Sequence, residues 1–134
     1  MRVKPFLMFE GRAEEAMDLY VSLFPGSEIV WIKRYGPEGP GPEGSVFQAV
    51  FRVADQEVMC IDSYAEHGFT FTPSWSLYVE CDSAEELTRI GAALEEGGSA
   101  LMPVGSYGFS ELFTWVADRF GVSWQLNYQG DAAT

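Results

Sequence analysis

Histidine and cysteine, the usual zinc ligands and frequent catalytic groups, are scarce in this sequence. It contains one histidine, His67, and two cysteines, Cys60 and Cys81. No Cys-x-x-Cys pair is present, so the ligand count excludes a structural zinc site. Each cysteine lies in a run of residues typical of a β-strand. We therefore expect two small buried thiols rather than a disulfide or a metal pair.

A glycine-rich segment matches the pattern of a nucleotide-binding loop. Residues 39–44 read Gly-Pro-Gly-Pro-Glu-Gly, which satisfies Gly-x-Gly-x-x-Gly. Such a loop binds phosphate through backbone N–H groups when it joins a strand to a helix. Here the segment lies between two strand-like runs, and its prolines remove N–H donors. We interpret it as a mobile β–β loop without a cofactor.

The charge balance limits the classes of partner. Twenty acidic and eight basic residues give a net charge of −12, which disfavours binding to nucleic acid or to an anionic membrane and favours a cationic ligand over an anionic one. No stretch approaches the ~20 apolar residues of a membrane span. The N-terminus lacks the features of a signal peptide. We expect a soluble cytoplasmic protein.

Strand and helix patterns follow one another in an order that occurs twice. In the first half we predict a strand at residues 5–9, a helix over about 12–24, and strands at 28–35, 46–54 and 57–63. In the second half a strand at 75–81 precedes a helix that ends at Gly97-Gly98. Strands at 100–104, 111–117 and 122–128 follow. Ser83 and Glu86 have the spacing of a capping box at the start of the second helix.

Short residue matches indicate that the second half is a duplicate of the first. Residues 26–27 recur at 98–99, and residues 53–55 recur at 116–118. The two copies of the first match lie 72 residues apart, and those of the second lie 63 residues apart. An insertion of nine residues at 36–44, in the first half only, explains the difference. We predict an α+β fold with two βαβββ modules in tandem, in a single domain spanning 1–134. Module one covers 1–63, a connecting loop 64–73, and module two 74–128.

Several motifs together resemble one known family. They are Phe9-x-Gly11-x-Ala13-Glu14-Glu15-Ala16 at the first helix, Trp75–Asp82 at the opening of module two, and the closing Asp118-x-Phe120-Gly121-x-x-Trp124. They resemble the PhnB-like branch of the vicinal oxygen chelate superfamily, often labelled 3-demethylubiquinone-9 3-methyltransferase. The resemblance implies the glyoxalase/bleomycin resistance fold, with curved mixed sheets enclosing a cavity. The modules could pair within one chain or across a homodimer, and the family implies a homodimer.

The superfamily's metal ligands are typically His or Gln from the first strand of each module and Glu from the last strand. By resemblance, these positions fall near Pro5, on Trp75, on Gln125, and on Asp62 or Ile61. Pro5 and Trp75 cannot act as ligands. We therefore expect no metal and no other cofactor. Asp62, His67 and Gln125 would be the weak candidates if a metal does bind.

The ligand positions suggest a cavity lined by Trp75, Trp115, Gln125 and Asp62, with Trp124 facing the opposite way from Gln125. Such a lining suits a flat or cationic organic ligand, although the tryptophans could instead only fill the core. Three functions remain open. They are metal-free ligand binding, a divalent-metal-dependent isomerase, lyase or dioxygenase with an atypical site, and methyl transfer as the family label suggests. The catalytic residues are unknown.

Overall fold

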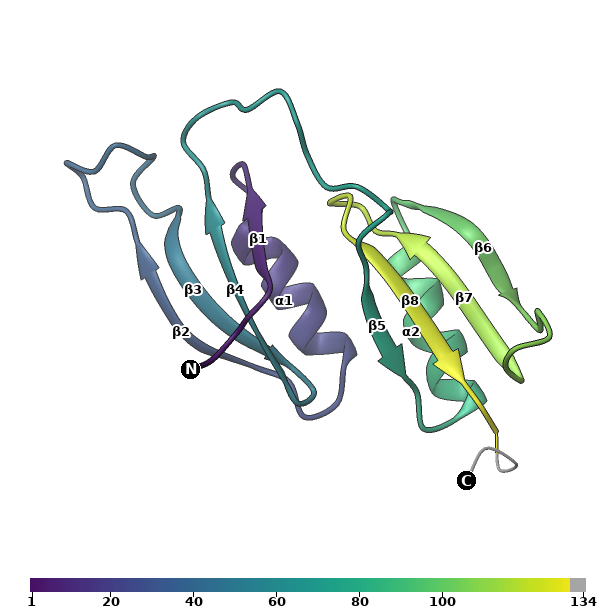
Figure 1. Ribbon diagram of the computed structural model, residues 1–134. Coiled ribbons are helices and arrows are strands. Elements are labelled where there is room, and N and C mark those ends of the chain that lie inside the picture. Colours follow the sequence, from purple (N-terminus) through teal and green to yellow (C-terminus); the bar gives the residue numbers. More distant parts are fainter. Residues whose placement is uncertain (131–134) are drawn as a thin grey trace. The chain divides into compact units, whose positions relative to one another are not determined.

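The chain forms two units with the same order of elements. The computed structural model describes residues 1–130. The first unit, Met1–Gly68, contains β1 (Phe6–Phe9), α1 (Ala13–Leu23), β2 (Glu28–Arg34), β3 (Val46–Val53) and β4 (Gln56–Asp62). The second, from Phe69 on, contains β5 (Leu77–Glu80), α2 (Ala84–Glu95), β6 (Ser99–Gly105), β7 (Leu112–Ala117) and β8 (Ser123–Tyr128). The prediction of two tandem βαβββ modules is confirmed (Figure 1).

Each unit is a four-stranded mixed sheet with one helix on it (Figure 1). The strand order is β1-β4-β3-β2 in the first sheet and β5-β8-β7-β6 in the second. The first and last strands of each unit are parallel neighbours, and the other pairs are antiparallel. Parallel strands cannot be joined by a tight turn, so the chain passes through α1, β2 and β3 between β1 and β4, and through α2, β6 and β7 between β5 and β8.

One face of the first sheet packs on α1. The buried side of α1 includes Tyr20, whose ring lies 5.9 Å from that of Phe51 on β3. Phe51 pairs with Val58 on β4, and both are fully buried. Side chains alternate between the faces of a strand, so Val58, Cys60 and Asp62 face α1. Ile61 faces the other way.

The second sheet packs on α2 in the same manner. Gly91 of α2 lies so close to Thr114 and Leu126 that a methyl group there would contact both side chains. Leu126 and Trp124 therefore face the helix, and neither exposes any surface. The opposite face carries Ser123, Gln125 and Asn127 from β8. We call this side the open face of the second sheet.

The two helices begin differently. At the start of α2 the Glu86 N–H donates to Ser83 Oγ (3.1 Å) and the Asp82 N–H donates to Glu86 Oε1 (3.0 Å). The first bond confirms the predicted cap at Ser83, while Glu86 accepts from the residue before the cap rather than from Ser83 itself. At the start of α1, the N-cap residue Arg12 forms no side-chain capping bond within the described residues. The N–H donors at this end must find acceptors elsewhere.

Four predicted strands begin one or two residues later than expected, and the largest difference is at β5. Trp75 lies in a turn before β5, where its N–H donates to Thr72 O, and Trp75 is about half exposed. Glu111 likewise precedes β7. Proline and serine around Trp75 favour a turn over the strand that its aromatic neighbours suggest.

The glycine-rich loop between β2 and β3 is held against Tyr35, which the expectation of a mobile loop did not anticipate. Tyr35 N–H donates to Ser45 O and Gly44 N–H donates to Tyr35 O, each at 2.9 Å. Gly41 lies against the face of the Tyr35 ring, where an added Cβ would approach the ring to 2.7 Å. The loop therefore needs a residue without a side chain at position 41.

Gly41→Ala is expected to lower the free energy of unfolding by about 1–3 kcal/mol, because the new methyl group overlaps the Tyr35 ring. Gly36→Ala is the matched control, since a Cβ at Gly36 meets nothing within 4 Å. Urea denaturation of both variants measures the difference. Equal midpoints for the two variants would show that the loop does not depend on its contact with Tyr35.

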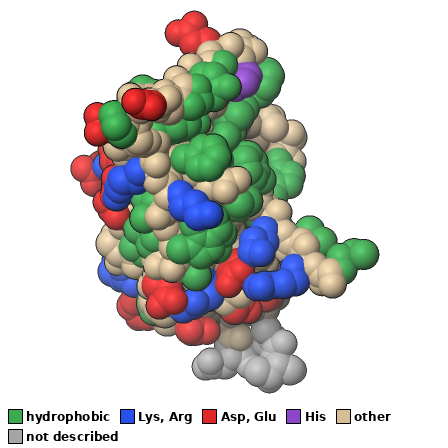
Figure 2. All heavy atoms as spheres, turned by 90° about the vertical axis from the view of Figure 1, so that its left-hand side faces the viewer, with side chains coloured by type: hydrophobic (Ala, Val, Ile, Leu, Met, Phe, Trp, Pro, Cys, Tyr) green, Lys and Arg blue, Asp and Glu red, His purple; other side chains and the backbone are tan. Residues whose placement is uncertain are grey.

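Most basic side chains of the first unit pair with acidic ones, and Figure 2 shows several blue and red side chains side by side. Arg34 contacts Glu14 at 2.6 Å and Arg52 contacts Glu28 at 3.1 Å. The Arg34 hydrogen bond lowers the pKa of Glu14.

Among the described residues, neither helix is long and apolar enough to cross a membrane.

Candidate functional site

Asp62 is buried and accepts three backbone hydrogen bonds. Its Oδ1 accepts from Gly11 N–H and Ala13 N–H, both at 2.9 Å, and its Oδ2 accepts from Val46 N–H at 3.0 Å. Only 4% of its surface is exposed. The carboxylate thus supplies the acceptors that the start of α1 lacks, and it also ties β4 to the start of β3. Asp62 is therefore a capping residue that comes from a distant strand.

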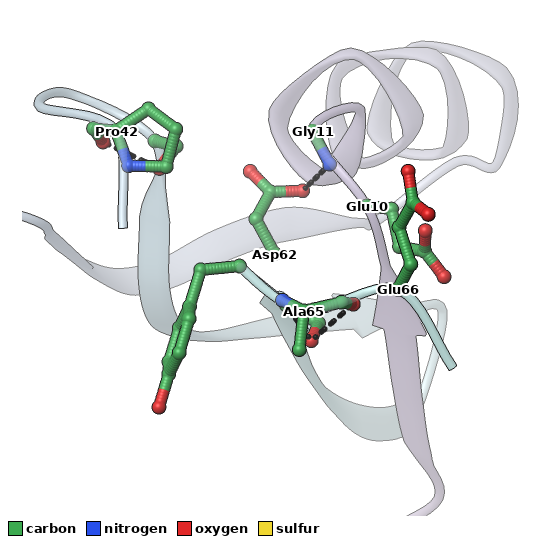
Figure 3. A pocket seen from close by; sticks show the side chains of 9 residues that line it. Glu10, Gly11, Pro42, Asp62, Ala65 and Glu66 are labelled. Carbon is green, nitrogen blue, oxygen red and sulfur yellow. Dashed lines mark hydrogen bonds between the residues drawn. The ribbon is translucent and has the colours of Figure 1, made fainter. Parts of the chain in front are cut away.

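A pocket of about 220 Å³ lies beside Asp62 in the first unit. Its lining comes from the end of β1, the β2–β3 loop and the segment after β4, and consists of Glu10, Gly11, Pro42, Ser45, Asp62, Ser63, Tyr64, Ala65 and Glu66. In Figure 3 the Asp62 carboxylate points to the Gly11 N–H. Both of its oxygens are occupied by N–H donors, so Asp62 offers the pocket little ligating capacity.

Asp62 is not the counterpart of Gln125. Asp62 faces the helix of its own unit, whereas Gln125 faces away from the helix of the second unit. The alternative position, Ile61, faces away from α1 as Gln125 faces away from α2. The prediction that Asp62 occupies a ligand position on the cavity side is therefore wrong by one residue along the strand. Ile61 has no ligating atom.

His67 interacts with its own loop. Its Nε2 lies 2.7 Å from Ser63 Oγ, and Ser63 Oγ also donates to Ala65 O at 3.1 Å. His67 does not line the pocket beside Asp62. Among residues 1–130, no three His, Cys, Asp or Glu side chains come together in a way that could hold a metal ion. The residues at the superfamily's ligand positions thus do not fit a divalent metal, and we derive no step through one.

Gln125 lies between two aromatic residues on the open face of the second sheet. Trp115 on β7 and Tyr78 on β5 are its direct neighbours across the strands. The Trp115 indole N–H donates to Ser123 Oγ at 2.9 Å, and Gln125 Nε2 donates to Ser76 Oγ at 3.3 Å. These bonds fix the tryptophan ring and the amide plane. The structure thus brings Trp115 and Gln125 together, as the sequence suggested.

The other two tryptophans of this unit have different surroundings. Trp124 faces α2, which confirms that it points away from the side of Gln125. Trp75 precedes β5, so strand alternation does not fix which face it takes. Tyr78, which lies at none of the ligand positions that the resemblance implies, occupies the position beside Gln125. Burial and the nearby Glu80 carboxylate raise the pKa of the Tyr78 hydroxyl, in agreement with a shared face.

A second buried carboxylate, that of Asp118, explains the closing motif of the chain, because other residues of the motif donate hydrogen bonds to it. Asp118 Oδ1 accepts from Phe120 N–H (2.9 Å) and Val122 N–H (3.0 Å), and its Oδ2 accepts from the Trp124 indole at 2.9 Å. Gly121 within this turn has a φ of +92°, a conformation that favours glycine. The Asp118–Trp124 motif thus builds the β7–β8 turn.

Both cysteines are buried on the helix-facing side or at a strand end, and burial raises the pKa of each thiol to about 12. At pH 8 we therefore expect almost no thiolate at Cys60 or Cys81 and slow modification by Ellman's reagent. In urea both thiols should react at the rate of a free cysteine. Fast labelling of the folded protein at pH 8 would contradict this expectation.

Comparison with known proteins places the chain in a family. A family model described as 3-demethylubiquinone-9 3-methyltransferase matches residues 1–127. The structure of a PhnB protein from Bacillus cereus shares 55% of its sequence with this chain, covers 96% of this chain and 99% of its own length, and gives a TM-score of 0.92. The structure of protein PA1353 from Pseudomonas aeruginosa is 29% identical and gives a TM-score of 0.80. The match covers 96% of this chain and 98% of PA1353.

A more distant match concerns the fold alone. The fosfomycin resistance protein FosX from Listeria monocytogenes, a vicinal oxygen chelate member, is 9% identical and has a TM-score of 0.62, with coverages of 98% and 94%. Comparison with curated proteins gave no match. The chain belongs to the 3-demethylubiquinone-9 3-methyltransferase family, which is the PhnB-like branch of the vicinal oxygen chelate superfamily.

Proposed function

We propose that this protein binds a small, flat organic ligand, aromatic or cationic, on the open face of its second sheet and does so without a metal ion. The observation that carries the proposal is the position of Gln125 between Trp115 and Tyr78. Aromatic faces supply apolar contact area and attract cations, while one amide between them provides directional hydrogen bonds.

The fixed geometry of these residues supports binding over simple core filling. Trp115 is only partly buried, and Tyr78 is 56% exposed. The bonds from Trp115 to Ser123 and from Gln125 to Ser76 hold both side chains before any ligand arrives. A site that is already ordered loses less conformational entropy when it binds. By contrast, Trp124 is fully buried and clearly belongs to the core.

A metal-dependent reaction is the alternative that the superfamily suggests. It would have to use Asp62, His67 and Gln125, but Asp62 already accepts three N–H groups and faces α1. Methyl transfer, named in the family description, has no residue in its favour. The segment 39–44 joins two strands, β2 and β3, and therefore lacks the helix that a phosphate-binding loop requires.

Tryptophan fluorescence tests the proposal. A panel of aromatic and cationic compounds should include ligands that change the emission of the wild type, and Trp115→Phe should remove most of that change. Gln125→Leu should weaken the affinity. Trp31→Phe is the matched control, because Trp31 lies on β2 of the first unit. An unchanged response in Trp115→Phe would contradict the proposed site.

Elemental analysis tests the metal-free part of the proposal. After incubation with Mn²⁺, Fe²⁺, Ni²⁺ or Zn²⁺ and desalting, we expect far less than one metal per chain. One metal per chain that is lost in His67→Ala or Gln125→Ala would instead favour the metal-dependent alternative.

We further propose that the protein is a homodimer, as the family resemblance implies. Sedimentation at micromolar concentration should then give twice the 14.9 kDa mass of one chain. A mass of a single chain under these conditions would contradict the dimer.

A further inference from the structure

Asn127 adds an unused acceptor to the open face of the second sheet. It lies on β8 two residues after Gln125, so both side chains are on the same face. Its neighbours across the strands are Phe113 on β7 and Glu80 on β5. The amide of Asn127 thus has an aromatic residue on one side and a carboxylate on the other.

The oxygen of this amide is buried without a partner. Asn127 is only 6% exposed, and its Oδ1 has no hydrogen-bond partner among residues 1–130. A buried acceptor without a donor costs free energy, since it has lost its water and gained nothing in return. Such a group is a natural contact for an N–H or O–H donor of a ligand.

A chain of amides fixes which atom of Asn127 remains unused. Gln129 Nε2 donates to the backbone oxygen of Phe109 at 3.3 Å, and that oxygen can only accept. Gln129 therefore turns its Oε1 toward Asn127, whose Nδ2 donates to it at 3.1 Å. Exchanging the oxygen and nitrogen of Asn127 would place two oxygens against each other. The Oδ1 must consequently point away from Gln129.

The charges around Asn127 favour a cationic donor. Glu80 is exposed and lies beside Asn127, and Tyr78 is two residues away on the same face of β5. The two basic residues of the second unit lie elsewhere: Arg89 is on α2, and Arg119 packs against Gly97 near the end of that helix. A positive group at Asn127 would therefore meet an opposite charge at Glu80.

We infer that the ligand of this site carries a primary or secondary ammonium group attached to a flat apolar group. Its N–H bonds to Asn127 Oδ1 beside the Glu80 carboxylate, and its apolar part lies against Trp115 and Tyr78. The two contacts are separated by two residues along β8, roughly 6.6 Å, which a short alkyl linker spans. This inference rests on the proposed function and specifies the chemical class of its ligand.

Three matched probes test it in the wild type. They are 3-phenylpropylammonium, its N,N,N-trimethyl derivative, which keeps the charge but has no N–H, and 4-phenylbutyrate, which reverses the charge. The primary ammonium should bind roughly tenfold tighter than either of the others. The side-chain amide resonance of Asn127 should shift with this probe in ¹H–¹⁵N spectra, a readout that requires no mutation.

Two substitutions separate the contacts. Asn127→Leu should abolish the difference between the primary and trimethyl ammonium probes, and Glu80→Gln should reduce the preference for ammonium over carboxylate. Equal binding of all three probes in the wild type, with loss in Trp115→Phe, would overturn this inference and leave the proposed function standing. If no compound of the wider panel binds the wild type, or if the response of the bound compounds is unchanged in Trp115→Phe, both the inference and the proposed function fail.

Discussion

Asp62→Ala is expected to lower the free energy of unfolding by about 3–5 kcal/mol, because three backbone N–H donors, two of them buried, lose a charged acceptor at once. Two of these donors lie at the start of α1 and the third at the start of β3. The substitution therefore loosens the helix and the sheet together. Thermal and urea denaturation followed by circular dichroism measure the loss.

Asp18→Ala serves as its control, since Asp18 is an exposed acidic residue on α1. This variant should stay within about 0.5 kcal/mol of the wild type. Asp62→Asn should fall between the two, because the amide retains one acceptor oxygen but presents N–H groups to backbone donors. If Asp62→Ala is as stable as the wild type and loses a bound metal instead, Asp62 is a ligand and our structural interpretation is wrong.

Gly98→Ala is expected to cost about 3 kcal/mol or more, since the obstacle is backbone rather than a flexible side chain. A Cβ at Gly98 would lie 2.1 Å from Ala117 O and 2.7 Å from the carbonyl carbon of Asp118. The turn held by Asp118 cannot give way without losing its bonds to Phe120, Val122 and Trp124.

The comparison for this variant is again Gly36→Ala, where the added methyl group has free space. Measuring both by urea denaturation isolates the steric effect from the general change of glycine to alanine. A Gly98→Ala protein with an unchanged midpoint would mean that the end of β7 can move away from the residues after α2.

The order of elements was accessible from the sequence because it depends on local patterns. The apolar period of α2 and the spacing of Ser83 and Glu86 act within a few residues, and the structure agrees with both. The opposite orientations of Trp124 and Gln125 follow from alternation alone. These features require no knowledge of distant contacts.

The roles of individual polar residues were less accessible. Asp62 caps a helix that begins 49 residues earlier in the chain, and no local pattern reveals such a partner. The position of Trp75 was missed because a turn delays β5 by two residues relative to the predicted strand. Asn127 could not be singled out because its unused oxygen depends on a chain of amide contacts through Gln129.

The different starts of the two helices imply different folding routes for the duplicated halves. The first turn of α2 is closed by Ser83 and Glu86, which are neighbours in sequence, so its nucleation requires little loop-closure entropy. The first turn of α1 is completed only when β4 has brought Asp62 beside it across about fifty residues. Helix formation and sheet formation are thus coupled in the first half and separable in the second.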